Sequence, residues 1–182
     1  STQDTTITFP PSVVSANPGL AGVKVEVPAN ALVSENGVRG GKVGIAPVPP
    51  DRLPEKLPAG LELPLVITVQ TSGPTNFDKP VPACFPNLPD PVTHELLPPG
   101  AKSALWSFDH DAGRFLVVGP MTVSADGKYV CTDPGVGIIK PGWHGSGPGS
   151  GPGPGPGPGP NNPGPGPNQK CKVDGLSCAQ SA

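Results

Sequence analysis

The proline content outside the C-terminal tract constrains the fold of this chain most strongly. Of 30 prolines in 182 residues, 21 lie within residues 1–144. A proline inside an α-helix removes a backbone donor and clashes with the preceding turn, which costs about 3 kcal/mol. Strands tolerate proline at their ends and edges. This region is therefore expected to be all-β.

Short alternating runs of apolar and polar residues predict the strands. Residues 22–28 read Gly-Val-Lys-Val-Glu-Val-Pro, with three valines on one face and two charges on the other, typical of a half-buried strand. An Asp126-Gly127 pair between Val123 and Val130 predicts a hairpin. Together the pattern indicates an antiparallel β-sandwich or an open barrel. The further predicted strands are 42–48, 65–69, 81–85, 104–108, 115–118, 121–124 and 129–132.

The alternation stops near residue 144, which divides the chain into three predicted parts. These are a β module over 1–144, a Gly/Pro-rich linker over 145–170, and a tail over 171–182 that resembles the start of a further module. Residues 145–167 hold 10 Gly and 9 Pro among 23 positions, so they lack the apolar side chains of a core. Glycine at every second position excludes a collagen helix, which needs it at every third. The segment is expected to be a disordered, partly extended tether.

Charge and composition exclude several classes of function. The formal net charge is -2, and Lys and Arg are scattered, so no basic face for nucleic acid is expected. A polybasic patch and a long apolar run are both missing, so membrane insertion is not expected. The chain begins at Ser1, which suggests a processed product or a fragment of a larger protein.

The sequence does not predict an enzyme. His94, His110 and His144 are the only histidines. A nucleophilic triad needs a nucleophile, a base and an orienting group held rigidly together. The neighbours His144 and Ser146 lie at the predicted edge of order, where such rigidity is not expected. No catalytic residue and no cofactor are therefore predicted.

Four cysteines allow three complete pairings. Cys84 and Cys131 fall in predicted strands, whereas Cys171 and Cys178 lie together beyond the tether. We favour the local pairs Cys84–Cys131 and Cys171–Cys178, with buried free thiols as the alternative for the first pair. Bridges of this kind indicate an oxidising compartment, and hence an extracellular or cell-surface location.

Two segments of the β module resemble a known family. Residues 22–32, Gly-Val-Lys-Val-Glu-Val-Pro-Ala-Asn-Ala-Leu, resemble the Gly-Val-x-x-x-Ile-Pro-Pro-Gly-Ala-Leu opening of the zonula-occludens/uncoordinated-five (ZU-five) domain. Residues 63–66 and 77–86 resemble its later strands, the last through Phe-Asp-Lys-Pro-Val-Pro. The resemblance implies a β-sandwich or barrel that contacts other proteins, and the tether suggests a bacterial surface-protein type.

The chain departs from the family at two points, which are residue 30 and the combination of a Gly-Pro tether with paired cysteines, foreign to the cytosolic animal members. Asn30 stands where the family tends to have glycine, and asparagine is the next best residue for a positive φ. Some relatives cleave themselves at a His-Phe-Ser site, and this chain has no His-Phe pair. Self-cleavage is therefore not expected.

Two further features are candidate sites. Asp109, Asp111 and Gly113 form Asp-x-Asp-x-Gly, which can begin a calcium loop, although turn chemistry alone explains these residues and is the favoured interpretation. Trp143 lies where the predicted order ends. It is interpreted either as a plug over the open end of the domain or as an exposed aromatic that binds a partner.

The predicted function is a non-catalytic structural and protein-interaction module of a larger multidomain surface or secreted protein. Its expected partners are other protein domains, some of them in the same parent chain. A carbohydrate-binding accessory module, with a glycan as partner, is the alternative, and a cytosolic adaptor with reduced thiols is the third reading.

Overall fold

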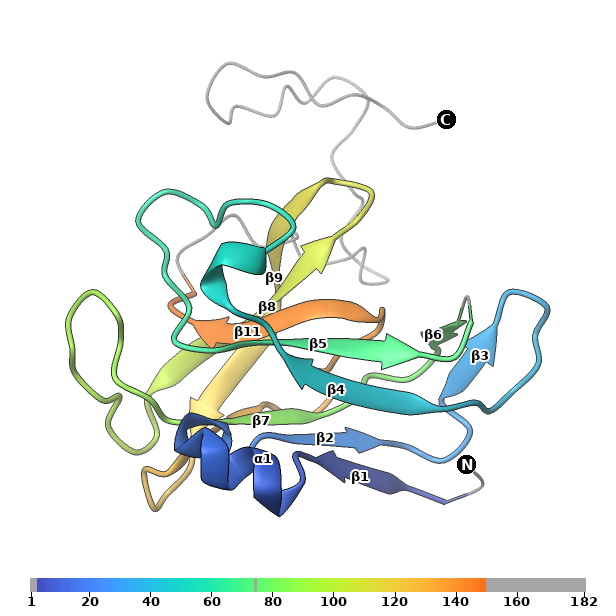
Figure 1. Ribbon diagram of the computed structural model, residues 1–182, viewed down its shortest axis with the longest axis horizontal. Helices are drawn as coiled ribbons and strands as arrows, with labels where there is room; N and C mark the ends of the chain where they lie inside the picture. Colours follow the sequence, from blue (N-terminus) through green and yellow to red (C-terminus); the bar gives the residue numbers. More distant parts are fainter. Residues whose placement is uncertain (1–2, 74, 150–182) are drawn as a thin grey trace, which may run out of the picture.

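The protein is described here from a computed structural model that places residues 3–73 and 75–149. Strands dominate the described chain (Figure 1). The elements in chain order are β1 (Thr5–Thr8), α1 (Pro11–Ala16), η1 (Pro18–Leu20), β2 (Lys24–Val27), β3 (Leu32–Ser34), β4 (Val43–Pro47), η2 (Pro50–Arg52), β5 (Val66–Thr71), β6 (Thr75–Phe77), β7 (Ala83–Pro86), β8 (Lys102–Asp109), β9 (Arg114–Val123), β10 (Tyr129–Thr132) and β11 (Gly142–Gly147).

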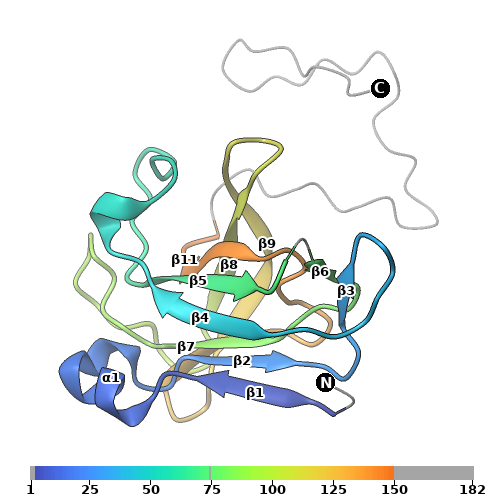
Figure 2. The ribbon, with the colours of Figure 1, turned by 45° about the vertical axis from the view of Figure 1, so that its right-hand side comes forward.

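Nine of these strands form one antiparallel sheet that nearly closes on itself. Their order is β1-β2-β7-β10-β9-β8-β11-β5-β4, and every neighbouring pair is antiparallel. The edge strands β1 and β4 come close together without pairing. Figure 2 shows the sheet from a second direction. The all-β prediction is thus confirmed, in the form of an open barrel.

A separate two-stranded ribbon of β3 and β6 sits at one side of the barrel (Figure 1). The chain enters β3 through a turn in which Asn30 has φ +57°, a conformation that asparagine tolerates better than most residues. β2, before this turn, pairs with β7, and β3, after it, pairs with β6. The strands on the two sides of the turn thus pair with two consecutive strands later in the chain.

The inner core fills the barrel with aliphatic and aromatic side chains. Phe85, Leu105 and Met121 are completely buried within it. Burial of one such large side chain contributes about 1.5–3 kcal/mol to folding. A disulfide joins Cys84 of β7 to Cys131 of the neighbouring β10, which is the pairing favoured from the sequence.

Strand β9 is a single ten-residue strand where the sequence predicted two. Its pairing with β8 shifts between Leu105 and Trp106, and the shift leaves Val118 as an extra residue in β9. An extra residue moves the following side chains to the opposite face. Phe115 and Val117 therefore face outward, whereas Met121 and Val123 enter the inner core.

Strand β11 includes residues 145–147, which the sequence analysis placed in the linker. The short α-helix α1 was not predicted from the sequence. It begins with Pro11 in its first turn, where no backbone donor is needed. No helix within the described residues has the length and apolar character required to cross a bilayer.

Candidate functional site

The outward face of β8 and β11 is covered by the long loop between β4 and β5. Trp106 and Phe115 are buried there, and Leu57 and Leu63 of the loop pack against them. We call this group the outer cluster. Its buried members are Ala104, Trp106 and Phe115, and its half-buried members are Leu53, Leu57, Leu61, Leu63, Phe108, Val117 and Trp143.

Glycines in β11 allow the loop to lie close to the strand. A Cβ atom on Gly145 would be 2.7 Å from the carbonyl oxygen of Leu65, and one on Gly147 would be 2.4 Å from Cδ2 of Leu63. Contacts this short cannot be accommodated without movement of the loop. The glycines that suggested a flexible linker therefore serve as a packing surface.

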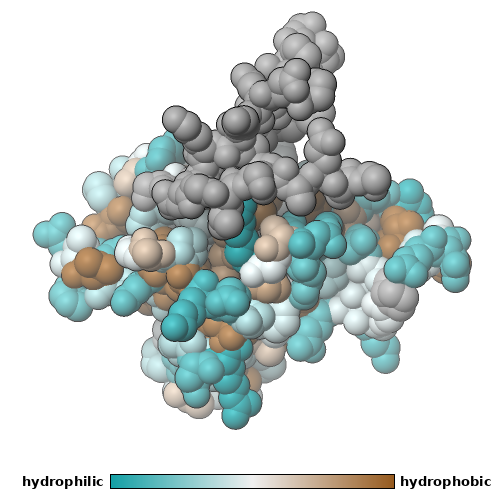
Figure 3. Space-filling model, turned by 90° about the horizontal axis from the view of Figure 1, so that it is seen from above, coloured by the Kyte–Doolittle hydropathy of each residue, from teal (hydrophilic) through white to brown (hydrophobic). Residues whose placement is uncertain are grey.

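The same loop, with the adjoining ends of β4 and β5, supplies most of the lining of a large groove of about 1260 Å³. Figure 3 looks down on the side of the molecule where this loop lies and shows hydrophobic patches interspersed with hydrophilic ones. Prolines and leucines make up most of the groove lining. Val92, from the loop before β8, also lines the groove, and its side chain is 62% exposed. The charged residues along it are Asp51, Glu55, Lys56 and Glu62, three acids against one base.

The groove was not predicted, although the sequence contains a usable signal for it. Leucines recur at positions 53, 57, 61, 63 and 65 between prolines, and only the last three follow a strand-like alternation. Such a segment has apolar side chains but no regular structure in which to bury them. It therefore has to pack against another part of the fold.

A smaller cavity of about 350 Å³ adjoins the groove at Pro64. Most of its polar side chains have partners within the chain. Asn87 donates from Nδ2 to the carbonyls of Leu97 and Gly127, at 2.8 and 2.9 Å. Lys102 donates from Nζ to Asp133 at 2.7 Å, and this hydrogen bond, followed by one from Thr122, lowers the pKa of the Asp133 carboxyl. These groups stabilise the rim of the cavity.

His144 is the most perturbed titratable group of the described chain. It lies on the inward face of β11, is 2% exposed, and its Nδ1 is 2.6 Å from the hydroxyl of Ser107 on β8. Burial lowers its pKa to about 3, while the backbone of Lys140 acts in the opposite direction. Nε2 has no hydrogen-bond partner. The ring is therefore neutral at ordinary pH.

The neighbour that the sequence suggested for His144 was Ser146, but the structure pairs it with Ser107. Both residues lie on strands inside the sheet, so the pair is rigidly held. The pair adjoins Ile67 of the inner core across the strand register, and neither residue lines the groove or the cavity. Its position favours a structural role.

The two candidate calcium ligands, for which a plain turn was the favoured interpretation, both contact other groups of the chain. Oδ1 of Asp109 accepts hydrogen bonds from the backbone of Asp111 and Ala112, at 2.9 and 2.7 Å, and thereby closes the β8–β9 turn. Asp111 forms an ion pair with Lys140 at 3.1 Å. Within residues 3–73 and 75–149, the acids, histidines and cysteines form no group of three or more that could hold a metal ion.

Trp143 is half-buried at the border of the outer cluster. Its ring meets Phe108 edge-on at 5.7 Å between centroids and His110 at 5.6 Å. The indole is thus flanked by other rings. Cys171 and Cys178, the remaining candidates, lie outside the described residues.

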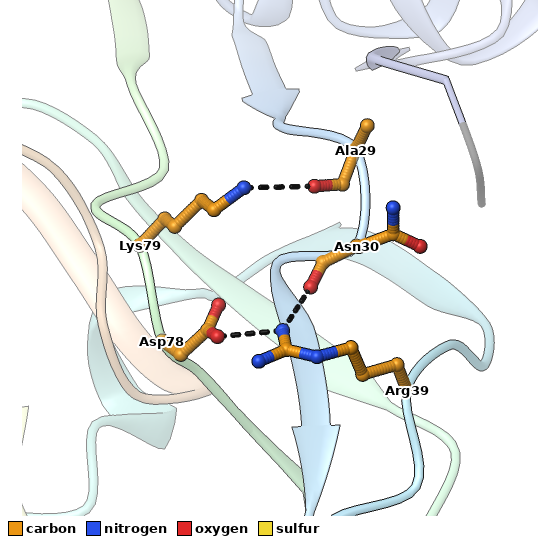
Figure 4. A network of polar contacts seen from close by, with 5 residues as sticks. All are labelled: Ala29, Asn30, Arg39, Asp78 and Lys79. Atoms are coloured by element: carbon orange, nitrogen blue, oxygen red, sulfur yellow. Dashed lines mark hydrogen bonds and ion pairs between the residues drawn. The ribbon is translucent and has the colours of Figure 1, made fainter.

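A surface network ties the turn before β3 to the segment after β6 (Figure 4). Arg39 donates from Nη1 to the carbonyl of Asn30 and to the carboxylate of Asp78, both at 2.6 Å. Lys79 donates to the carbonyl of Ala29 at 3.3 Å. These exposed contacts each contribute little energy but hold the Asn30 turn in place.

Comparisons with protein-family models, with curated proteins and with solved structures found no match to this chain.

Proposed function

We propose that this chain is a non-catalytic structural and protein-interaction module of a larger multidomain surface or secreted protein. The observation that carries the proposal is the groove beside the β4–β5 loop. A volume of about 1260 Å³ exceeds the usual range of small-molecule sites, which is roughly 300–1,000 Å³, and suits a segment of another protein.

The chemistry of the groove supports one kind of partner. Leu53, Leu57 and Val92 offer apolar surface, while the surrounding charges are three acids against one base. Complementary charge steers association and fixes orientation. The fitting partner is an extended protein segment that carries apolar side chains flanked by lysine or arginine.

An extracellular or cell-surface location accords with this function. The Cys84–Cys131 disulfide is compatible with such a location, because bridges of this kind persist in oxidising compartments. The ZU-five resemblance supports the same use as a protein-contact domain. The surface-protein type within that family remains part of the proposal.

The carbohydrate-binding alternative requires exposed aromatic rings on which a sugar can stack. Proline and aliphatic side chains line the groove and the cavity instead, and every aromatic residue of the described chain lies elsewhere. The groove therefore favours a protein partner over a glycan.

Fluorescence anisotropy with two synthetic peptides tests the proposal. Both carry the same leucine and proline core, one with lysine flanks and the other with glutamate flanks. The basic peptide should bind the full chain, and Val92→Lys should weaken its binding about tenfold. Val38→Lys is the matched control, because Val38 is 66% exposed and lies away from the groove. Binding of a soluble polysaccharide, but of neither peptide, would overturn the proposal in favour of the glycan alternative.

A further inference from the structure

The chain leaves the barrel from a strand that has neighbours on both sides. β11 pairs with β5 through residues 142–145 and with β8 through residues 144–147. The edge strand β1, at the other end of the chain, has four paired positions with β2 alone. The two ends of the described chain are thus anchored very differently.

The two ends also lie at opposite ends of the barrel. Six antiparallel steps separate β1 from β11 in the sheet, so the two strands run in the same direction. Figures 1 and 2 both show the start of β1 and the arrowhead of β11 at opposite ends of the barrel. Tension between the two ends of the chain therefore acts along the strands.

The direction of such a pull determines how the hydrogen bonds respond. In an antiparallel pair the bonds run perpendicular to the strands. A pull along the strand strains all of them together, whereas a pull across the strand breaks them one after another. A pull along β11 is therefore resisted by its hydrogen bonds to β5 and to β8 at the same time.

Two side chains of β8 hold the backbone where it leaves β11. Ser103 donates from its buried hydroxyl to the carbonyl of Gly147 at 2.9 Å. Trp106, which is 1% exposed, donates from Nε1 to the carbonyl of Pro148 at 3.0 Å. We call these two contacts the exit clamp. Through them β8 also binds the backbone at Pro148, one residue past the end of β11.

From these contacts we propose that the C-terminal end of the barrel is a tension-resistant anchor. β11, held between β5 and β8 and fixed by the exit clamp, resists a pull from the 33 residues that follow Gly149. If β11 were pulled out, unravelling of the chain from this end would stop at Cys131 of β10, because Cys131 is bonded to Cys84 of β7. The inference rests on the proposed role as a module within a longer protein, but not on the partner of the groove.

Single-molecule force spectroscopy on the full chain tests this anchor by varying only the point of attachment. One handle stays at the C-terminus, and the second is attached through an azide-bearing residue at position 112 or position 96. Ala112 lies in the β8–β9 turn, beside the start of β11, so this pull runs along the strand. Leu96 is 58% exposed in the loop before β8, beside the end of β11, so this pull peels the strand away. The first geometry should need at least about twofold more force, because the perpendicular bonds then resist together.

Variants of the exit clamp complete the test. Ser103→Ala and Trp106→Phe should each lower the force measured through position 112. Ser34→Ala, which also removes one hydrogen bond but on the β3–β6 ribbon, should leave that force unchanged. Equal forces from the two attachment points, or an equal effect of Ser34→Ala, would overturn the inference. Peptide binding is measured without tension, so failure here is distinguishable from failure of the proposed function.

Discussion

The inner core and the outer cluster are two hydrophobic regions built on opposite faces of the same sheet. The inner core is enclosed by the nearly closed nine-stranded sheet, and Phe85 and Leu105 within it have no exposed surface. The outer cluster is closed by an irregular loop, and its leucines remain half-buried. The inner core is therefore expected to determine stability, while the outer cluster shapes the groove.

The largest difference between the two regions should appear on truncation of a core side chain. Phe85→Ala should lower the free energy of unfolding by about 3–5 kcal/mol, since it removes a fully buried ring and leaves a cavity. Leu57→Ala in the outer cluster should cost only about 1 kcal/mol, because half-exposed sites recover part of the loss by relaxation. Urea denaturation measures both values. Equal losses would show that the two regions act as a single core.

A smaller effect should come from filling the space between β11 and the loop. Gly145→Ala should destabilise the protein by about 1–3 kcal/mol, because the added methyl group would meet the backbone of Leu65. Gly44→Ala in β4 is the control, since no atom lies within 4 Å of the added Cβ. The change in Trp fluorescence, together with the urea midpoint, reports the displacement of the loop. A neutral Gly145→Ala would contradict the close packing of the loop on β11.

The smallest of the three effects concerns pH and the inward face of β11. Unfolded His144 takes up a proton near pH 6.5, but the folded side chain does so only at about pH 3. The unfolded state therefore binds more protons between these values, so stability is complete above pH 6.5 and falls as the pH drops toward 3. The loss should reach about 1–2 kcal/mol by pH 5.

Urea titrations at pH 7 and pH 5 measure this loss. His144→Gln should abolish most of the difference between the two pH values, and His110→Gln, which changes an exposed ring, should retain it. An unchanged pH dependence in His144→Gln would assign the effect to other groups.

The strands of the inner core were predictable because alternation reports one buried face. Val25 and Val27 of β2 alternate with charged residues, and the turn at Asp126-Gly127 joins β9 to β10 as predicted. The disulfide partners were also foreseen. The signals for the strands and the turn are local, since each is contained in a few consecutive residues. The two cysteines are 47 residues apart and could be paired because both fall in predicted strands of the β module.

The missed elements depend on contacts between distant segments. β1 has Thr at three of its four positions and only one half-buried side chain. β11 has glycines where the β4–β5 loop, 80 positions earlier in the chain, packs against it. The bulge at Val118 likewise split one strand into two apparent runs. The groove was missed for the same reason, since its loop gains its structure only from the sheet beneath it.

The position of β11 in the sheet also has a consequence for how the chain folds during its synthesis. Gly142 pairs with Val69, which is made 73 residues earlier, and β11 is the last described strand to be synthesised. Until then β5 and β8 each present an unpaired edge that can join other chains. Pairings so distant in sequence form slowly. The nascent protein is therefore expected to depend on chaperones until β11 has been synthesised and has paired with both β5 and β8.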